Sequence, residues 1–479
     1  MLIWGFIMGD IFGRDGEIKV LESLLKSKKS EFLALWGRRR VGKTYLVDRF
    51  FRTKGLYFHF TGMKGASLKE HLEIFHYNLN ERFEINFEPA KSWVKAFLNL
   101  RSAVNGVDSK QQIILFFDEV PWIATRRSGF LKALEHFWND YLSRRGNAVL
   151  IVCGSAASWM IEKIVKNKGG LHNRLTEKMC IEPFSITDTK KYLKGVQIDL
   201  SQKQLIDLYM VTGGVAQYLT YVKRGKSSAQ MIQELCFEKN SPLRGEYEVL
   251  FSSLFESSQN HLAVIETLAQ HKSGLTHSQL LKKTGLPSGG SFTDILNELK
   301  EAGFINVLPL YNKQKKDARL YLCDEYCLFY HSWIKNYRPK IKDHFWLDTI
   351  GSTRYLAWSG LAFESICKKH LSQIIDALGI QLVAVDAVYW RAHDGSCQID
   401  LIIDRKDNTM NLCEIKYYNA EVVFDSKDAQ AIAFRKERFR ALTKTKKTLL
   451  STLISVYGVK ENSAFFEAFD NQVIFEELV

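Results

Sequence analysis

The chain has 479 residues, enough for about three domains of ordinary size. Its apolar fraction of 46% and charged fraction of 25% are ordinary for globular protein, and the lack of any run of eighteen apolar residues excludes a membrane-spanning helix. The net charge of +13 suits a polyanionic partner, nucleic acid first, with a generally basic protein as the alternative.

The N-terminal segment and the cysteines indicate in which cellular compartment the protein is expected. The first ten residues, MLIWGFIMGD, are apolar but lack the basic start and cleavage site of a signal peptide. Eight cysteines are scattered, mostly in apolar runs, without the paired CxxC motifs of a zinc site. Free buried thiols suit a reducing compartment, so we expect a cytoplasmic protein.

Residues 1–184 alternate short apolar runs with helical stretches. The strand candidates are Phe32–Trp36, Leu56–Phe60, Ile113–Phe117, Val149–Cys153 and Met179–Ile181. Such alternation is typical of a parallel sheet covered by helices.

The first strand leads into a glycine-rich loop that opens a helix. The loop comprises Gly37, Arg38, Arg39, Arg40, Val41, Gly42, Lys43 and Thr44. The spacing Gly-x4-Gly-Lys-Thr in this context is that of a P-loop, in which backbone N–H groups and a helix N-terminus surround phosphate oxygens. We expect the loop to bind ATP, with Lys43 at the β- and γ-phosphates and Thr44 on Mg²⁺.

Two further strands end in polar residues. The strand at 113–117 is followed by Asp118 and Glu119, the Walker B pattern. Asp118 is expected to hold the Mg²⁺ shell and Glu119 to polarise the attacking water, which favours hydrolysis over storage of the nucleotide. Ser155 follows the strand at 149–153 and is either a sensor of the γ-phosphate or an ordinary loop serine.

These motifs resemble a broad prokaryotic family of AAA+/STAND-like ATPases, best known from archaea. Residues 36–44, WGRRRVGKT, are similar to its P-loop; residues 12–17 resemble its FxGRxxE signature, and 118–122 and 154–157 resemble its Walker B and sensor segments. The resemblance implies that Gly13 and Arg14 lie near the nucleotide.

Residues 171–176, LHNRLT, resemble its LYGRxT segment with His-Asn in place of Tyr-Gly. Arg174 is therefore a candidate arginine finger, with an ordinary surface ion pair as the alternative.

Residues 185–254 predict helices throughout, which suits the helical lid of this family. Residues 213–216, GGVA, resemble its GGxP segment with alanine in place of proline. Residues 255–330 predict three short helices and two strands, at His261–His271, Thr276–Leu281, Ser291–Ala302, Phe304–Pro309 and Arg319–Cys323.

The pattern at 255–330 resembles a winged helix-turn-helix. Its third helix would enter a major groove, and the lysine-rich hairpin tip at 312–316 would touch phosphate. Asp294, Glu298 and Glu301 on the exposed face of that helix would repel phosphate, so a domain-docking role is the alternative.

A basic stretch around Trp333–Lys342 is expected to link to residues 345–479, which mix helix and strand. Here Asp400 and Glu414-x-Lys416 match the core of PD-(D/E)xK nucleases, a domain that many family members carry at this place. Glu414 and Lys416 share one side of a strand because they are two residues apart, and Asp400 joins them from a neighbouring strand. Two carboxylates can hold Mg²⁺, and the lysine can orient or deprotonate a water.

Two further features belong to this C-terminal region. Glu364 resembles the accessory carboxylate of such nucleases. Gln430, Arg435 and Lys436 lie on a basic helix that either binds a nucleic-acid backbone or is simply solvated.

The expected fold is therefore α/β: a parallel P-loop sheet, a helical lid, a winged helix-turn-helix and a C-terminal α/β restriction-endonuclease-like domain. The leading hypothesis is an ATPase whose nucleotide state controls a nuclease-like, DNA-associated domain. The alternatives are an ATP-switched DNA-binding or regulatory protein with an inactive C-terminal domain, and a protein-handling AAA+ ATPase. Relatives form either ring-shaped homo-oligomers or closed monomers, and both states stay open.

Overall fold

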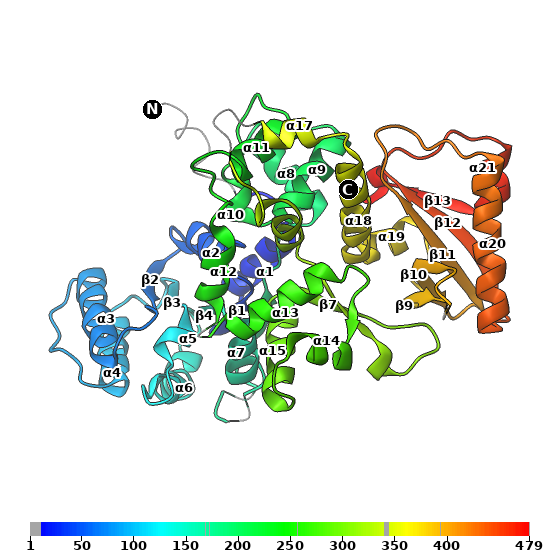
Figure 1. Ribbon diagram of the computed structural model, residues 1–479. Helices are drawn as coiled ribbons and strands as arrows, with labels where there is room; N and C mark the ends of the chain where they lie inside the picture. Colours follow the sequence, from blue (N-terminus) through cyan, green and yellow to red (C-terminus); the bar gives the residue numbers. More distant parts are fainter. Residues whose placement is uncertain are drawn as a thin grey trace. The chain divides into compact units, whose positions relative to one another are not determined.

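The structure, a computed structural model, divides into two compact units, Met1–Pro183 and Phe184–Val479 (Figure 1). It describes residues 11–167, 169–171, 173–255, 257–339, 344–392 and 394–478. The N-terminal segment discussed above and His172 of the LHNRLT segment lie outside these residues. Each unit is described separately below.

A five-stranded sheet forms the centre of the first unit. Its strands are β1 (Glu31–Trp36), β2 (Leu56–Thr61), β3 (Ile113–Asp118), β4 (Ala148–Gly154) and β5 (Glu177–Cys180). All neighbours pair in parallel, in the order β2-β3-β4-β1-β5. Each predicted strand is confirmed, because a central parallel strand buried on both faces needs a continuous apolar run. In this order β4 lies between the P-loop strand β1 and the acidic strand β3.

Helices cover both faces of this sheet. One apolar cluster joins alternate strand residues such as Leu33 and Leu35 to α1 (Asp15–Lys26) and α2 (Lys43–Phe51). The other joins Phe32 and Ala34 to α3 (Leu68–Phe83), α4 (Trp93–Asn105) and α6 (Phe130–Asp140). The remaining elements are α5 (Val120–Ile123), η1 (Leu142–Arg144), α7 (Ala157–Met160) and η2 (Ile161–Val165). The unit is thus a three-layer α/β/α arrangement, which leaves the carboxyl ends of the strands for the P-loop and the acidic pair.

The second unit begins with helices, as the sequence predicted. They are α8 (Ile186–Gly195), α9 (Gln202–Thr212), α10 (Ala216–Leu219), α11 (Ser228–Cys236) and α12 (Glu246–Leu254). Gly213, with φ of +56°, ends α9, and Gly214, with φ of +70°, follows it. A Cβ on Gly214 would collide with the carbonyl oxygen of Phe184, so glycine is required at this turn.

Three short helices and a small sheet follow. They are α13 (Gln259–Gln270), α14 (His277–Thr284) and α15 (Gly290–Glu301), with β6 (Leu275–Thr276), β7 (Ile305–Leu308), η3 (Lys315–Asp317) and β8 (Arg319–Leu322). Thr276 is the N-cap of α14, where Thr276 and Gln279 form a capping box. The antiparallel order β6-β8-β7 includes a two-residue strand, β6, that the sequence did not predict.

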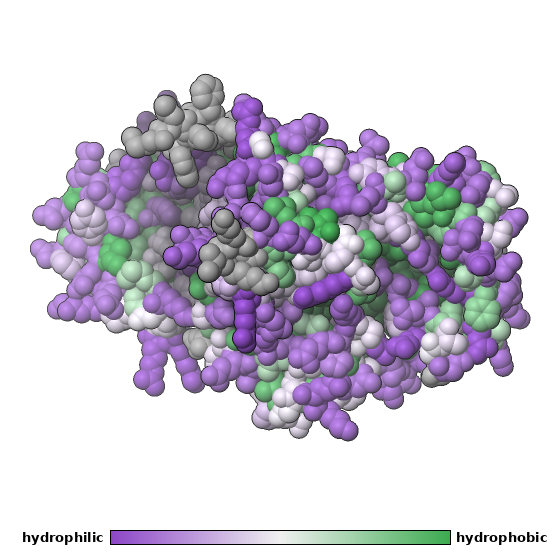
Figure 2. All heavy atoms as spheres, turned by 45° about the horizontal axis from the view of Figure 1, so that its top comes forward, coloured by the Kyte–Doolittle hydropathy of each residue, from purple (hydrophilic) through white to green (hydrophobic). Residues whose placement is uncertain are grey.

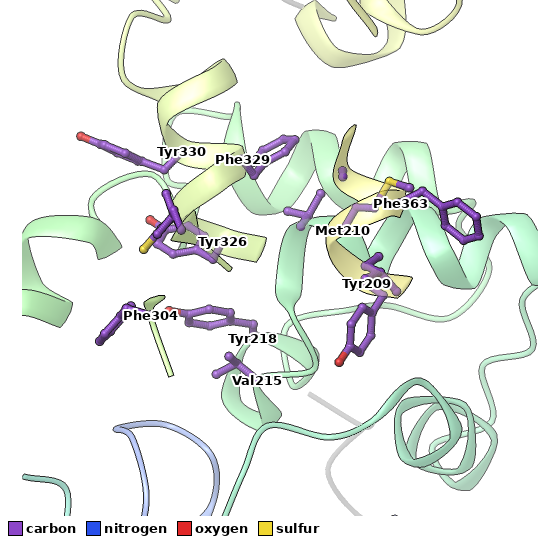
Figure 3. Close-up of a cluster of buried hydrophobic side chains, with 14 of the residues drawn as sticks. Tyr209, Met210, Val215, Tyr218, Phe304, Tyr326, Phe329, Tyr330 and Phe363 are labelled. Atoms are coloured by element: carbon purple, nitrogen blue, oxygen red, sulfur yellow. The ribbon is translucent and has the colours of Figure 1, made fainter. Parts of the chain in front are cut away.

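The expected basic linker is partly wrong. Trp333 lies in η4 (Tyr330–Ile334), which follows α16 (Glu325–Phe329), and it is buried against Trp346 of α17 (Phe345–Thr349). Tryptophan stabilises a core more than a linker, so Trp333 belongs to the core of the second unit. Residues 340–342, at the end of the expected linker, lie outside the described residues. Figure 3 shows part of the same core, where Tyr218 of α10 lies against Tyr326 of α16, and Phe329 belongs to the same helix as Tyr326.

The C-terminal part holds a five-stranded mixed sheet of order β13-β12-β11-β10-β9. Its elements are α18 (Thr353–Lys369), α19 (Leu371–Ala377), β9 (Ala384–Arg391), β10 (Gln398–Arg405), β11 (Thr409–Lys416), α20 (Ser426–Thr443), β12 (Thr448–Ser455), α21 (Ser463–Ala468), β13 (Asn471–Ile474) and η5 (Phe475–Leu478). β9, β10 and β11 pair antiparallel, whereas β11, β12 and β13 pair in parallel. In Figure 1 α20 and α21 lie along one face of this sheet and α18 along the other.

The hairpin between β7 and β8 reaches the edge of this sheet. Leu310 forms an isolated bridge with Tyr389 of β9. The Tyr311 N–H donates to the Tyr389 carbonyl at 3.0 Å, and the Tyr389 N–H donates to the Pro309 carbonyl at 3.0 Å. The Tyr311 ring also packs on Phe439 of α20. The hairpin therefore extends the sheet at its β9 edge.

One apolar cluster runs through the whole second unit, from Phe184 to Leu478. The predicted division of this unit into a lid, a winged helix and a nuclease-like domain stays a prediction. On the face drawn in Figure 2 hydrophilic side chains predominate, and hydrophobic ones form small scattered groups. Among the residues that the structure describes, no helix is both long and apolar enough to cross a bilayer.

Candidate nucleotide site and C-terminal carboxylate site

The P-loop turns tightly between β1 and α2. Gly37 has φ of +147°, and a Cβ there would collide with the carbonyl of Ile181, next to β5. Gly42, with φ of +94°, is the N-cap of α2, so the first N–H groups of the helix open towards the loop. Arg40 also has a left-handed backbone, with φ of +74°. These turns explain why glycine is needed at both ends of the motif.

Lys43 lies inside the curve of the loop. Its side chain is buried, and Nζ donates to the carbonyl oxygens of Gly37 at 2.8 Å and Arg38 at 3.0 Å. These bonds hold the ammonium where backbone N–H groups of the α2 terminus converge. Such a cradle of amides around a buried cation fits terminal phosphates of a nucleotide. Val41 anchors the loop in the core, whereas Arg39 is exposed.

The acidic pair meets the P-loop across the sheet. Thr44 Oγ1 donates to Asp118 Oδ2 at 2.6 Å, and Asp118 Oδ1 accepts from the Glu119 N–H at 2.9 Å. Asp118 is only 2% exposed. A hydroxyl and a carboxylate in contact are the hard oxygen ligands that Mg²⁺ prefers, so these two residues fit that ion.

Glu119 connects the ends of β3 and β4. Its backbone is left-handed, with φ of +49°, which is rare for a residue with a side chain. Its Oε2 accepts from the Ser155 N–H at 3.2 Å and from Ser155 Oγ at 2.9 Å. The structure thus places Ser155 beside the carboxylate that the sequence proposed as the water-polarising group.

Arg14 lies against the P-loop, although it is distant in sequence. Its Nη2 donates to the carbonyls of Val41 and Glu182, both at 2.9 Å, and Nη1 pairs with Glu17 at 2.8 Å. Gly13 precedes it with φ of +67°. Arg14 therefore ties the N-terminal signature to the loop, and Glu17, the last residue of that signature, orients the Arg14 guanidinium.

Arg174 differs from the other residues proposed for this site. It is exposed in the loop before β5, and none of the described hydrogen bonds or ion pairs involves its guanidinium. The structure does not bring Arg174 to the P-loop by any described contact. Its role as a finger stays a prediction.

The second candidate site lies at the end of β10 and β11. Their pairing joins Leu401 to Cys413, and one further step places Asp400 opposite Glu414. Lys416 Nζ lies 2.9 Å from Glu414 Oε1, and Arg435 of α20 pairs with Glu414 Oε2. Arg435 was expected to face nucleic acid or solvent, but it neutralises a strand carboxylate instead. No local pattern links these two residues, which is why the sequence did not predict the contact.

The charges of this site differ from one carboxylate to the next. Burial, followed by the charge of Asp400, raises the pKa of Glu364 to about 7. Burial and the charge of Glu414 also raise the pKa of Asp400, although Lys368 opposes this. Burial alone would raise the pKa of Glu414, but Lys416 and Arg435 bring it below its ordinary value. Glu364 and Asp400 thus form a partly buried pair of carboxylates whose nearby positive charge does not offset the effect of burial on their pKa values.

The predicted metal set is not assembled as a three-ligand site. Within the described ranges, no group of three or more His, Cys, Asp or Glu side chains is placed to hold a metal ion. The Glu414 carboxylate already pairs with Lys416 and Arg435. Glu364 Oε2 lies 3.6 Å from Lys368 Nζ. Of the three carboxylates predicted to bind a metal, Glu364 and Asp400 therefore remain as candidate ligands of a hard cation such as Mg²⁺ in this conformation.

The acidic residues of α15 differ in whether they contact another helix. Glu298 Oε2 lies 2.6 Å from His261 Nε2 of α13, whereas Asp294 is exposed. One of the three acidic residues thus holds two helices together. Glu298 is therefore engaged within the unit, whereas the sequence analysis placed it on the exposed face that would repel phosphate.

A polar contact joins the helices after the first unit to the C-terminal sheet. Asp207 of α9 accepts from Tyr355 Oη at 3.1 Å and Tyr417 Oη at 2.5 Å, and Lys203 Nζ lies 2.7 Å from its other oxygen. Tyr417 directly follows Lys416. The predicted lid is thereby bonded to the strand that carries Glu414 and Lys416.

A buried ion pair makes a second connection of this kind. Lys369 Nζ at the end of α18 donates to both oxygens of Glu325, at 3.0 and 2.9 Å. A Cβ on Gly213 would collide with Glu325, so the glycine turn after α9 closes directly over this pair. Neither connection was visible in the sequence pattern.

Comparison with known proteins bears on the region that contains the P-loop. Residues 11–222 match a family described as an ATPase domain predominantly from Archaea, so this part of the chain is similar to such a domain. A protein of Methanocaldococcus jannaschii without a described function is 25% identical over 411 residues, which cover 84% of this chain and 87% of that protein. The ATP-binding subunit ClpL of the Clp protease of Staphylococcus aureus is 26% identical over 196 residues, 40% of this chain and 26% of that protein.

Two solved structures are similar at low identity. A Walker-type ATPase of Pyrococcus abyssi has a TM-score of 0.49 and 16% identity, covering 69% of this chain and 99% of that chain. The ORC2 protein of Aeropyrum pernix, in ADPNP–ADP complexes, has a TM-score of 0.44 and 12% identity, covering 69% of this chain and 96% of that chain.

Proposed function

We propose that this protein binds and hydrolyses ATP at the P-loop and that its nucleotide state controls the C-terminal, nuclease-like and DNA-associated region. The observation that carries the proposal is the contact of Thr44 with Asp118 at 2.6 Å, beside the contact of Glu119 with Ser155 at 2.9 Å. Together these contacts support a site in which the P-loop binds phosphates, Thr44 and Asp118 supply hard oxygen ligands and Glu119 polarises water.

Each residue then has a chemical role. Lys43 and the N–H groups of residues 37–44 bind and orient the terminal phosphates, replacing the carbonyl contacts that Lys43 makes in this structure. Thr44 and Asp118 would hold Mg²⁺, which supplies charge neutralisation at the phosphates when bound. Glu119 orients and polarises water, and Ser155 positions Glu119.

The contacts within the second unit support the control of the C-terminal region. Asp207 in the predicted lid bonds to Tyr417, which adjoins Lys416. A movement of α9 that breaks this bond would leave a buried carboxylate short of a donor, so the end of β11 is expected to move with the helix. By this route a change at the lid reaches the residues of the carboxylate site.

A second candidate function is an ATP-switched DNA-binding or regulatory protein whose C-terminal site is inactive. It is favoured by the neutralisation of Glu414 by both Lys416 and Arg435. A carboxylate held by two cations is a weak ligand for a third. In this case the site would bind a nucleic-acid backbone without cleaving it.

The ATPase proposal is tested with Lys43→Ala. Loss of the ammonium and its loop contacts should weaken ATP binding by at least about a hundredfold and abolish turnover. The exposed Lys95, on α4, supplies the matched control Lys95→Ala. ATP affinity by calorimetry and phosphate release are measured for both variants, and normal turnover in Lys43→Ala contradicts the proposal.

A cleavage assay decides between the two C-terminal roles. Plasmid DNA is incubated with the full chain and Mg²⁺, with and without ATP. Cleavage that disappears in Asp400→Asn but persists in the exposed-site variant Asp376→Asn supports a nuclease. DNA binding without cleavage in every sample supports the regulatory protein.

A further inference from the structure

The first unit has a groove that the proposed ATPase chemistry does not use. Its volume is about 730 Å³, and it lies between two segments. One segment is residues 124–132, the loop after α5 and the start of α6; the other is Trp159 of α7 with Lys163 of η2. In the sequence, the two segments follow Glu119 and Ser155, which come directly after β3 and β4.

The groove is strongly basic. Arg126, Arg127, Lys132 and Lys163 line it, all are exposed, and its lining includes no carboxylate. Among the ion pairs and side-chain hydrogen bonds that the structure describes, none involves these four cations. Four like charges around one hollow repel each other unless an anion lies between them, so the groove suits a polyanion.

An aromatic side chain lies among these cations. Trp159 is partly buried, packs against the apolar cluster behind β3 and β4, and still lines the groove. A rigidly held indole beside phosphate-binding cations is the combination with which proteins bind single strands, because phosphates meet the cations and a base stacks on the ring. An acidic peptide would satisfy the charges but would leave the indole unused.

We propose that this groove binds single-stranded nucleic acid, independently of the winged-helix-like and C-terminal regions. Arg126, Arg127, Lys132 and Lys163 contact successive phosphates, and Trp159 stacks on an unpaired base. The contacts favour no particular sequence, because the four cations are assigned to phosphates and an aromatic face can stack on any base.

The test measures binding of a fluorescein-labelled oligothymidylate to the full chain by anisotropy, without nucleotide and over a series of salt concentrations. The groove variant is Arg126→Glu/Arg127→Glu. The control is Lys91→Glu/Lys95→Glu, which changes the net charge equally at two exposed positions near the start of α4. The groove variant should bind at least about tenfold more weakly with a shallower salt dependence, and the control should stay within about twofold. An equal loss in both variants, or no loss in either, overturns the proposal.

Trp159 provides a second, uncharged test. Trp159→Leu should weaken binding by about tenfold, whereas Trp159→Phe, which keeps an aromatic face, should retain most of the affinity. Polyglutamate at equal charge concentration should fail to displace the oligonucleotide, and displacement would indicate an acidic protein partner instead. ATP affinity is measured for every variant as a check of folding. Because Lys43→Ala should leave oligonucleotide binding unchanged, failure of this proposal and failure of the ATPase proposal are distinguishable.

Discussion

Glu119 combines a left-handed backbone with a carboxylate that faces Ser155. Such conformations persist where the surrounding structure enforces them, often at functional sites. Glu119→Gln keeps the size of the side chain and an oxygen that can accept from Ser155, but it removes the charge. ATP affinity should stay within about threefold, and turnover should fall by about a hundredfold or more.

Nucleotide binding and phosphate release are the measurements for this variant. Glu73→Gln, at an exposed position of α3, is the control and should behave as the unmodified chain. Turnover within twofold of normal in Glu119→Gln would remove this residue from the proposed chemistry.

Glu364 gives a dependence of stability on pH. Its pKa in the folded chain is about 7, above its ordinary value, so the folded state binds more protons than the unfolded state between about pH 4.5 and 7. Its ionisation therefore destabilises the fold as pH rises through this range. Glu364→Gln should raise the free energy of unfolding by about 1–3 kcal/mol at pH 8 and by nearly nothing at pH 4.5.

Thermal unfolding at both pH values checks this expectation. Glu421→Gln, at an exposed position, should show no such dependence. A gain for Glu364→Gln that is equal at pH 4.5 and pH 8 would point to packing rather than to ionisation.

At the scale of elements, the bond between α9 and the end of β11 is the clearest target. Tyr417 Oη donates to Asp207 at 2.5 Å, and burial, followed by the Asp207 charge, raises the pKa of Tyr417 well above its ordinary value. Tyr417→Phe deletes the donor and leaves a partly buried carboxylate with fewer partners. We expect a loss of about 1–3 kcal/mol in the stability of the second unit.

The neighbouring Tyr418 supplies the matched control, because its side chain is 50% exposed. Thermal unfolding of Tyr417→Phe and Tyr418→Phe should separate them clearly. If both variants unfold at the same temperature as the unmodified chain, the bond does not connect α9 to β11 in solution.

The same elements show what the sequence could and could not predict. The central strands β1, β3 and β4 were predicted within about two residues because each is a continuous apolar run, and the P-loop and Asp118-Glu119 were predicted because their spacing is local. Trp333 was wrongly assigned to a linker, since neighbouring basic residues concealed its burial. The contacts Asp207–Tyr417 and Glu414–Arg435 join residues distant in sequence, and no periodicity encodes such pairs.

At the scale of the whole molecule, the two compact units lead to a prediction about fragments. A fragment 184–479 should fold alone, because its apolar cluster extends from Phe184 to Leu478. A fragment 345–479 should fold poorly, because it exposes Trp346 and Trp358, which pack on Trp333 in the intact unit. Circular dichroism with thermal unfolding checks both.

Cooperative unfolding of the longer fragment and its absence in the shorter one are the expected results. A shorter fragment that unfolds cooperatively would instead support the predicted independent nuclease-like domain. The contacts around Trp333 would then be an interface between domains rather than a shared core.

The hairpin that reaches β9 has a consequence for solubility. An unpaired outer strand offers its N–H and C=O groups to any other chain, and proteins cover such strands to avoid aggregation. Here the Pro309 carbonyl and the Tyr311 N–H already form hydrogen bonds with the backbone N–H and C=O groups of Tyr389 in β9. Shortening the hairpin to study DNA contact would uncover that strand, and self-association through it would then imitate a loss of nucleic-acid binding.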